Sequence, residues 1–234
     1  MKEYLLQCAA KKEIELTIAQ AEQFEVYYRL LLEWNEKINL TAITEPREVV
    51  AKHFIDSLEG LRFLPQNVKL VDVGTGAGFP AIPLKLARPD IDVLLLDSLN
   101  KRILFLDEVI RALGLKGISV LHGRAEELAK QKLREQFDVA TARAVANLSV
   151  LSEYCLPYVK VGGLFLAYKG SRAEQEAKEA ENAVKILGGT VRELHKYSLP
   201  DIDVQYAIVV TEKKRPTPQK YPRGNGKISK SPLA

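Results

Sequence analysis

The segment LVDVGTGAGFP, residues 70–80, constrains the fold more than any other part of the chain. Its first residues have the character of a buried strand, and glycines follow at positions 74, 76 and 78 before Pro80. Glycines allow a backbone to approach a ligand closely, and a helix beginning at Pro80 would point free N–H groups at an anion. The segment predicts a strand–turn–helix unit that binds a nucleotide, although a tight turn can also need glycine for its own geometry.

Strands and helices are predicted to alternate from residue 67 to residue 211. Helical stretches separate apolar runs that fit buried parallel strands, at 69–73, 92–97, 118–122, 137–142 and 163–169. A long charged helix is expected at about 172–187. Two further strands, GTVRELHKYSL and VQYAIVVTEK, are joined by LPDID, which is too short for a crossover helix, so they should pair antiparallel.

This order predicts an α/β fold with a Rossmann-like doubly wound sheet whose last strand is antiparallel. It is the layout of class I S-adenosylmethionine-dependent methyltransferases, whereas dinucleotide dehydrogenases continue with βαβ units to the sixth strand. Residues 67–211 are therefore predicted to form a methyltransferase domain.

Two segments flank this domain. Residues 1–66 have helical periodicity, with Thr17 and Gln20 at the spacing of a capping box and a second helix expected at about 46–61. Neither helix can bury its apolar stripe alone, so this N-terminal helical subdomain should pack on the core. Residues 212–234 contain four prolines and two glycines without an apolar period, which predicts a basic, extended or disordered tail.

Charge is distributed unevenly along the chain. The net charge is +4, yet the segment from Lys213 onward has seven Lys or Arg and no acidic residue, so the rest of the chain sums to −3. Such a tail suggests a polyanionic partner, with a solvated tail that binds nothing as an equal alternative. The two cysteines are far apart and the three histidines lack metal-ligand spacing, so we expect free buried thiols and no metal site.

No apolar run approaches the length of a membrane span, and the first residues lack the pattern of a signal peptide. We therefore expect a cytoplasmic protein without membrane contact, and nothing in the pattern suggests a state other than a monomer.

The choice among nucleotide ligands rests on the glycine spacing and on Asp72. The Gly-Lys-Ser/Thr of a P-loop is absent, and G-x-G-x-G is one residue shorter than the dinucleotide fingerprint G-x-G-x-x-G. A carboxylate at the end of the strand would repel a pyrophosphate but attract the positive charges of S-adenosylmethionine. We therefore predict S-adenosylmethionine as the cofactor, while noting that Asp72 could instead cap the local backbone.

Acidic residues after the second and third strands fit the remainder of this cofactor. Asp97 ends the second strand and can accept hydrogen bonds from both ribose hydroxyls, although it could equally cap the following helix. Ala125 and Glu126 fall where an adenine should lie, but RAEELAK is also an ordinary helix start.

The acceptor is indicated by the end of the fourth strand, TARAVANL, which places Arg143 and Asn147 at the carboxyl edge of the sheet. The Asp/Asn-Pro-Pro-aromatic motif of enzymes that methylate exocyclic amines is absent there, and so is a cysteine for a covalent mechanism. An atom that is already nucleophilic, such as guanine N7, fits better, because alignment and charge placement then suffice without a general base.

Longer segments resemble the RsmG family, also called GidB: WNEKINLTAI, HFIDSL, VDVGTGAGFPAIPLKL, DSLNKRILFL, RAEE and TARAVANLSVL. That family methylates N7 of a guanosine in small-subunit ribosomal RNA with S-adenosylmethionine. The resemblance implies that Arg143 lies beside cofactor and target, and we predict it as the catalytic residue. Asn39, His53, Asp56 and Ser57 match family positions without an evident role, and His53 is interpreted as joining the N-terminal helices to the sheet.

Taken together, the predicted cofactor-binding residues are Asp72, Gly74, Gly76, Gly78, Phe79, Asp97, Ser98, Leu99, Ala125, Glu126 and Arg143. The predicted RNA-binding residues are Lys101, Arg102, Arg124, Lys169 and Arg223. The predicted function is methylation of guanine N7 in 16S ribosomal RNA or in the small ribosomal subunit. The alternatives are an RNA-binding module with a vestigial cofactor site, a methyltransferase for another substrate, and, least favoured, an NAD-dependent oxidoreductase.

Overall fold

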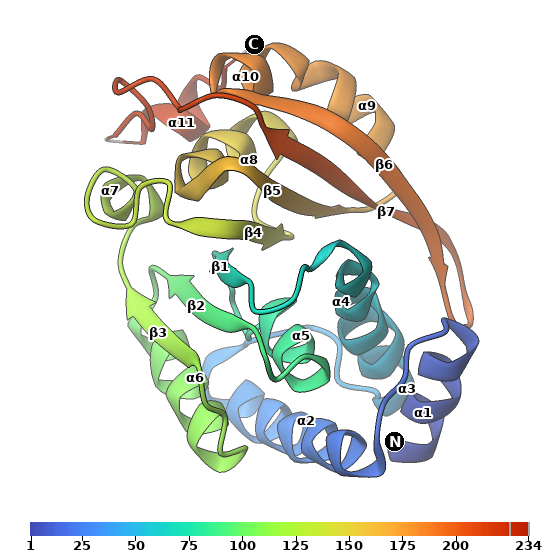
Figure 1. The fold of residues 1–234 in the computed structure, drawn as a ribbon. Coiled ribbons are helices and arrows are strands. Elements are labelled where there is room, and N and C mark those ends of the chain that lie inside the picture. The colour runs from blue at the N-terminus through green and yellow to red at the C-terminus, as the bar shows by residue number, and fades with distance from the viewer. Residues whose placement is uncertain (225, 234) are drawn as a thin grey trace.

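A seven-stranded sheet forms the centre of the computed structural model, which describes residues 1–224 and 226–233 (Figure 1). The strand order is β3-β2-β1-β4-β5-β7-β6. The strands are β1 (Lys69–Val73), β2 (Asp92–Asp97), β3 (Ile118–His122), β4 (Phe137–Arg143), β5 (Val159–Lys169), β6 (Gly189–Leu199) and β7 (Ile202–Lys213). The first five strands are parallel and β7 runs antiparallel between β5 and β6. The predicted fold class is confirmed.

Helices cover both faces of the sheet, and each face has its own apolar core. One core joins the sheet to α1 (Lys2–Lys11), α2 (Ile18–Ile38), α5 (Ala81–Ala87) and α6 (Asn100–Ala112). The other core lies under α7 (Ala125–Leu128), α8 (Leu148–Cys155), η3 (Leu156–Tyr158), α9 (Ala173–Glu179) and α10 (Glu181–Ile186). Successive residues of β1 serve the two cores in turn, because side chains alternate along a strand.

The N-terminal extension packs on the first core (Figure 1). Helix α2 begins with the predicted capping box of Thr17 and Gln20. The second expected helix is one run built of α3 (Pro46–Val49), a π-helical segment η1 (Val50–Ile55), α4 (Asp56–Leu58) and a 3₁₀ segment η2 (Glu59–Phe63). The charged helix expected at about 172–187 is divided at Ala180, which is fully buried between α9 and α10. Both cysteines are buried and free.

The C-terminal segment is packed against the domain, so the expectation of an extended or disordered tail is wrong for its described residues. Lys213 is fully buried, and its ammonium donates to the carbonyls of Leu156 and Val159 and to the hydroxyl of Thr217. The guanidinium of Arg134 donates to the Thr217 and Tyr221 carbonyls at 2.6 and 2.9 Å. These contacts are polar, which is why the segment shows no apolar period in the sequence.

An ion pair fixes the segment further along. Glu153 of α8 is 0% exposed, and it accepts hydrogen bonds from Nε and Nη2 of Arg223 at 2.9 and 2.6 Å and from the Arg223 backbone N–H at 2.7 Å. The short helix α11 (Lys227–Lys230) follows and buries Ile228. The basic segment therefore forms part of the folded body.

Candidate active site

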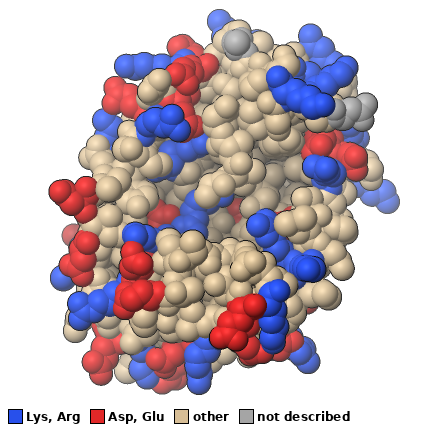
Figure 2. Space-filling view, turned by 180° about the vertical axis from the view of Figure 1, so that it is seen from behind, with Lys and Arg blue, Asp and Glu red and all other residues tan. Residues whose placement is uncertain are grey.

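Three adjoining cavities lie at the carboxyl ends of the parallel strands. They flank the end of β1, which lies between β2 and β4. We name them by one feature each: the glycine cavity of about 460 Å³, the Glu126 cavity of about 160 Å³ and the Tyr206 cavity of about 330 Å³. The space-filling view shows a hollow near the middle of one face, with basic and acidic atoms inside it (Figure 2). Ligands of doubly wound folds bind at this kind of crevice.

The glycine loop forms the floor of the glycine cavity. Its backbone is tied to β2, because the N–H groups of Gly74 and Thr75 donate to the Leu96 carbonyl at 2.9 and 3.0 Å. Gly76 has a φ of +61°, and a Cβ added to it would meet no atom within 4 Å, so its backbone faces open space. At Gly78 an added Cβ would strike Ile82 and the Tyr27 hydroxyl. Gly76 thus admits a ligand, whereas Gly78 is required for packing.

Asp72 lies beneath this loop. Its side chain is 0% exposed and accepts hydrogen bonds from the hydroxyls of Thr75 and Thr141 at 2.6 and 2.7 Å. Burial raises the pKa of Asp72 to about 7, against the hydrogen bonds from both threonines and the nearby Arg143, which lower it. Asp72 therefore supports the loop through two threonine hydroxyls, and its contact with the cofactor stays a prediction.

The raised pKa of Asp72 predicts that the free energy of unfolding decreases as the pH rises. Its pKa is higher in the folded chain than the usual 3.8, so its contribution is fully present below about pH 4 and is lost as the pH rises through 7. Relative to Asp72→Asn, the wild type should lose about 2 kcal/mol of unfolding free energy between about pH 5.5 and about pH 8.5. Urea denaturation at both pH values measures this, with the exposed Asp107→Asn as control. A parallel response of wild type and Asp72→Asn would contradict the prediction.

Asp97 connects the loop, the start of α6 and the wall of the cavity. Its carboxylate accepts hydrogen bonds from the backbone N–H groups of Gly76 and Leu99, both at 2.9 Å, and pairs with Arg102 at 3.3 Å. Asp97 lines both the glycine cavity and the Glu126 cavity together with Ser98. The side chain therefore fixes the backbone just before α6 and also lines the cavity, while its contact with a ribose stays a prediction. Leu99 itself is 52% exposed.

The Glu126 cavity is small and contains a carboxylate that is free to accept hydrogen bonds. Glu126 is 8% exposed, and its carboxylate has no hydrogen-bond or ion-pair partner within residues 1–224 and 226–233. Ala125 opens α7, so its backbone N–H lies at a position where a helix supplies no partner. The Ala125 carbonyl accepts from the Tyr158 hydroxyl at 2.7 Å. A free carboxylate beside a free N–H suits an adenine edge.

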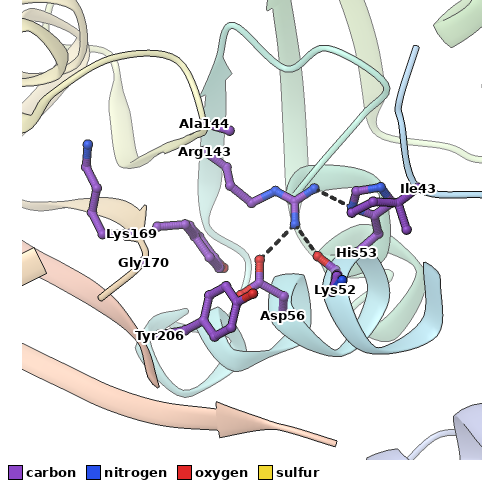
Figure 3. Close-up of a pocket in the computed structure, with 10 residues that line it drawn as sticks. Ile43, Lys52, His53, Asp56, Arg143, Ala144, Lys169, Gly170 and Tyr206 are labelled. Atoms are coloured by element: carbon purple, nitrogen blue, oxygen red, sulfur yellow. Dashed lines mark hydrogen bonds and ion pairs between the residues drawn. The ribbon is translucent and has the colours of Figure 1, made fainter. Parts of the chain in front are cut away.

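Arg143, at the end of β4, is held by the helical run of residues 46–63 (Figure 3). Its Nη1 donates to the Lys52 carbonyl and to the Asp56 carboxylate, each at 2.7 Å, and its Nη2 lies 3.0 Å from His53 Nδ1. The guanidinium also lies 5.0 Å from the ring centroid of Phe79. Arg143 lines both the glycine cavity and the Tyr206 cavity and forms part of the wall between them.

His53 is a neutral imidazole in this network. Burial, and next the charge of Arg143, lower the pKa of His53 to about 3. Its Nδ1 accepts from Arg143, so its Nε2 carries the hydrogen and donates to the Thr41 hydroxyl at 2.9 Å. The ring stacks on Phe79 at 4.6 Å. His53 thus joins the N-terminal extension to the sheet, as interpreted, and also lines the site.

Asp56 has a position in the site that sequence reasoning did not assign. One oxygen accepts from Arg143 and the other accepts from the Tyr197 hydroxyl of β6 at 2.7 Å. The segment HFIDSL contains a usable signal, because residues three apart in a helix share a face and place His53 and Asp56 together. Tyr197 and Tyr206 come from the antiparallel hairpin, and the sequence gives no comparable signal for them.

The predicted RNA-binding residues fall into two groups. Lys101 is exposed, while Arg102 and Arg124 lie at the rims of the glycine and Glu126 cavities. Lys169 is instead paired with Glu176 at 2.7 Å and Arg223 with Glu153. Lys169 and Arg223 are thus each paired with a glutamate, and their contact with RNA stays a prediction.

The residues present fit S-adenosylmethionine. The glycine cavity and the Glu126 cavity are contiguous at Gly74, Asp97, Ser98 and Val145, and their combined space is in the range of small-molecule sites. Open space above Gly76 and the unpartnered Glu126 carboxylate are the observations that a ligand with an amino-bearing ring would explain. Within the described residues no group of His, Cys, Asp or Glu is placed to hold a metal ion. Nor does any described helix combine the length and hydropathy needed to cross a membrane.

The sequence is similar to those of a known protein family. The family model GidB, described as rRNA small subunit methyltransferase G, matches residues 20–204. The Ribosomal RNA small subunit methyltransferase G of Desulforamulus reducens is 51% identical over 233 residues, covering 98% of this chain and 97% of the relative. The Staphylococcus aureus protein of the same name is 49% identical, covering 99% and 98%.

Solved structures share the fold at low identity. A SAM-dependent methyltransferase from Aquifex aeolicus matches with a TM-score of 0.56 at 18% identity, covering 74% of this chain and 96% of that one. M. jannaschii TYW2, solved in complex with AdoMet, matches with a TM-score of 0.55 at 14% identity, covering 68% and 76%.

Proposed function

The chain belongs to the GidB family of rRNA small subunit methyltransferases G, and from that premise we propose that it transfers the methyl group of S-adenosylmethionine to N7 of a guanosine in 16S ribosomal RNA. The observation that carries the proposal is the contiguity of the glycine and Glu126 cavities, which fit the cofactor, with a third cavity across Arg143. The partner is small-subunit ribosomal RNA or the small ribosomal subunit. The protein acts as a monomer in the cytoplasm.

The chain holds its cofactor through carboxylates and backbone. Asp97 keeps one unused acceptor site for the ribose, since a carboxylate can accept about four hydrogen bonds and three are made in the fold. Glu126 accepts from the adenine amine, and Gly76 admits the chain of the amino acid part. When bound, S-adenosylmethionine supplies an electrophilic methyl group on a positively charged sulfur.

The transfer requires no base from the protein. The lone pair of guanine N7 would form the new carbon–nitrogen bond, the bound cofactor would supply the methyl group and keep the electrons of its carbon–sulfur bond, and no proton would have to move. His53 is unsuited to act as a base, because its pKa is low and its Nδ1 already accepts a hydrogen bond from Arg143. Methylation makes the guanine a cation. The ion pair with Asp56 compensates the positive charge of Arg143, which would otherwise repel that cation. Alignment is therefore the main task of the site.

The test combines binding and transfer. Calorimetry should detect S-adenosylmethionine binding, and labelled methyl should pass to 16S ribosomal RNA or small subunits at N7 of one guanosine. Asp97→Ala should weaken cofactor binding by about tenfold or more, since a hydrogen bond to a charged group contributes about 1.5–3 kcal/mol. Asp107→Asn, on the exposed side of α6, is the control. Failure of the wild type to methylate either RNA form would overturn the proposal, and binding of RNA without cofactor would favour an RNA-binding module.

A further inference from the structure

The Tyr206 cavity is left without a ligand when the cofactor occupies the other two. It adjoins the glycine cavity and shares His53, Arg143 and Ala144 with it. A molecule in the Tyr206 cavity would therefore face the cofactor across the Arg143 side chain. The cofactor's own groups are already accounted for by the loop, Asp97 and Glu126, so this third space is available to an acceptor.

Its walls come from both ends of the chain (Figure 3). Ile43 and the helical run of residues 46–63, which includes Asp56, form one side of the cavity, and Tyr206 of β7 forms another, with Arg143 paired to Asp56. The Tyr206 ring is partly exposed and is backed by Tyr197, with ring centroids 6.2 Å apart and planes 24° apart. Within the part of the chain that is described, the Tyr206 hydroxyl makes no hydrogen bond.

Size and an aromatic surface narrow the class of ligand. A cavity of about 330 Å³ has room for a purine base. A supported, partly exposed tyrosine ring is the kind of surface on which single-stranded bases stack. Lys52 and Lys169 also line the cavity, but Glu48 and Glu176 already pair with them, so the charge of the cavity does not select the ligand.

We propose that the Tyr206 cavity receives the acceptor guanine as an unpaired base, with the ring of Tyr206 as the surface on which it stacks and Gly170 at the rim by which it enters. The proposal rests on the proposed function and adds to it the subsite and the unpaired state of the acceptor. The hairpin of β6 and β7 then contributes directly to acceptor binding.

Gly170 allows the cavity to be filled without removing any contact. It lines the Tyr206 cavity, its backbone lies outside the left-handed region, and a Cβ added to it would meet no atom within 4 Å. Gly170→Leu should therefore fold normally and project into the cavity. We expect it to lower kcat/KM for 16S ribosomal RNA by about 100-fold or more while leaving calorimetric S-adenosylmethionine affinity within about twofold, and the smaller Gly170→Ala to stay within about threefold of wild type.

Tyr206 gives an independent measurement. Tyr206→Ala should raise the KM for the RNA about tenfold or more, and Tyr206→Phe, which keeps the ring, should restore most of the loss. Val204→Ala, an exposed position of the same strand, is the matched control. The proposal is overturned if both Gly170→Leu and Tyr206→Ala methylate RNA like the wild type with cofactor binding intact. The proposed function itself fails only if the wild type transfers no methyl group, so the two failures are distinct.

Discussion

Arg143→Ala is expected to lower the free energy of unfolding by about 3–5 kcal/mol and methyl transfer by about 100-fold or more. Asp56 is almost fully buried and forms its only ion pair within the described residues with Arg143, so removal of the guanidinium leaves a buried carboxylate without its cation. The same substitution frees His53 and the Lys52 carbonyl, which loosens the wall between the glycine cavity and the Tyr206 cavity. Urea denaturation and the methyl-transfer assay measure the two effects separately.

A double variant separates the effect of the unpaired Asp56 charge on stability from the effect of the lost Arg143 hydrogen bonds on methyl transfer. Asp56→Asn combined with Arg143→Ala should recover a large part of the lost stability, because the uncompensated charge is gone, while transfer stays low. Arg143→Lys should also transfer slowly, since one ammonium cannot reproduce the fork that reaches three acceptors. Equal stability of Arg143→Ala and the wild type would show that the pair contributes little to the fold.

Arg223→Ala is expected to destabilise the protein by a similar amount, about 3–5 kcal/mol, although the residue lies in a segment whose sequence suggests disorder. Glu153 is 0% exposed, and the described residues offer it no other cation than Arg223. Loss of the guanidinium should also release the segment that follows, which limited proteolysis detects as new cleavage after residue 217.

The exposed Lys230→Ala removes the same charge from the same segment and should change stability by less than about 0.5 kcal/mol. The double variant Glu153→Gln/Arg223→Ala should recover part of the unfolding free energy that Arg223→Ala loses, because the buried negative charge is gone. If Arg223→Ala and Lys230→Ala are equally stable and equally resistant to protease, the segment is not anchored by this ion pair.

The sequence predicts those features of the fold and the site that depend on residues close together in the chain. Strand and helix periods gave the sheet, the short loop LPDID gave the antiparallel hairpin, and the carboxyl ends of parallel strands brought Gly76, Asp97 and Glu126 to one edge. Each of these rests on local spacing together with one rule of topology.

Contacts between distant segments could not be predicted in this way. Asp56 and Tyr197 are 141 residues apart, and their hydrogen bond depends on how the hairpin leans over the helical run. The anchored C-terminal segment depends on Glu153 being buried beneath it, and a glutamate in a helix looks the same in sequence whether it is buried or exposed. Asp72 was correctly placed at the strand end, but its direction, down toward Thr141, is decided by packing.

The division of the site between early and late segments has a consequence during translation. Gly76, Asp97, Glu126 and Arg143 have all been synthesised before the hairpin that supplies Tyr197 and Tyr206 exists. Chains grow from the N-terminus at about 5–20 residues per second, so for several seconds a nascent chain carries the residues of the glycine and Glu126 cavities without Tyr206 of the third cavity. If the proposed sites are right, the methyl donor can be bound before the acceptor site is complete.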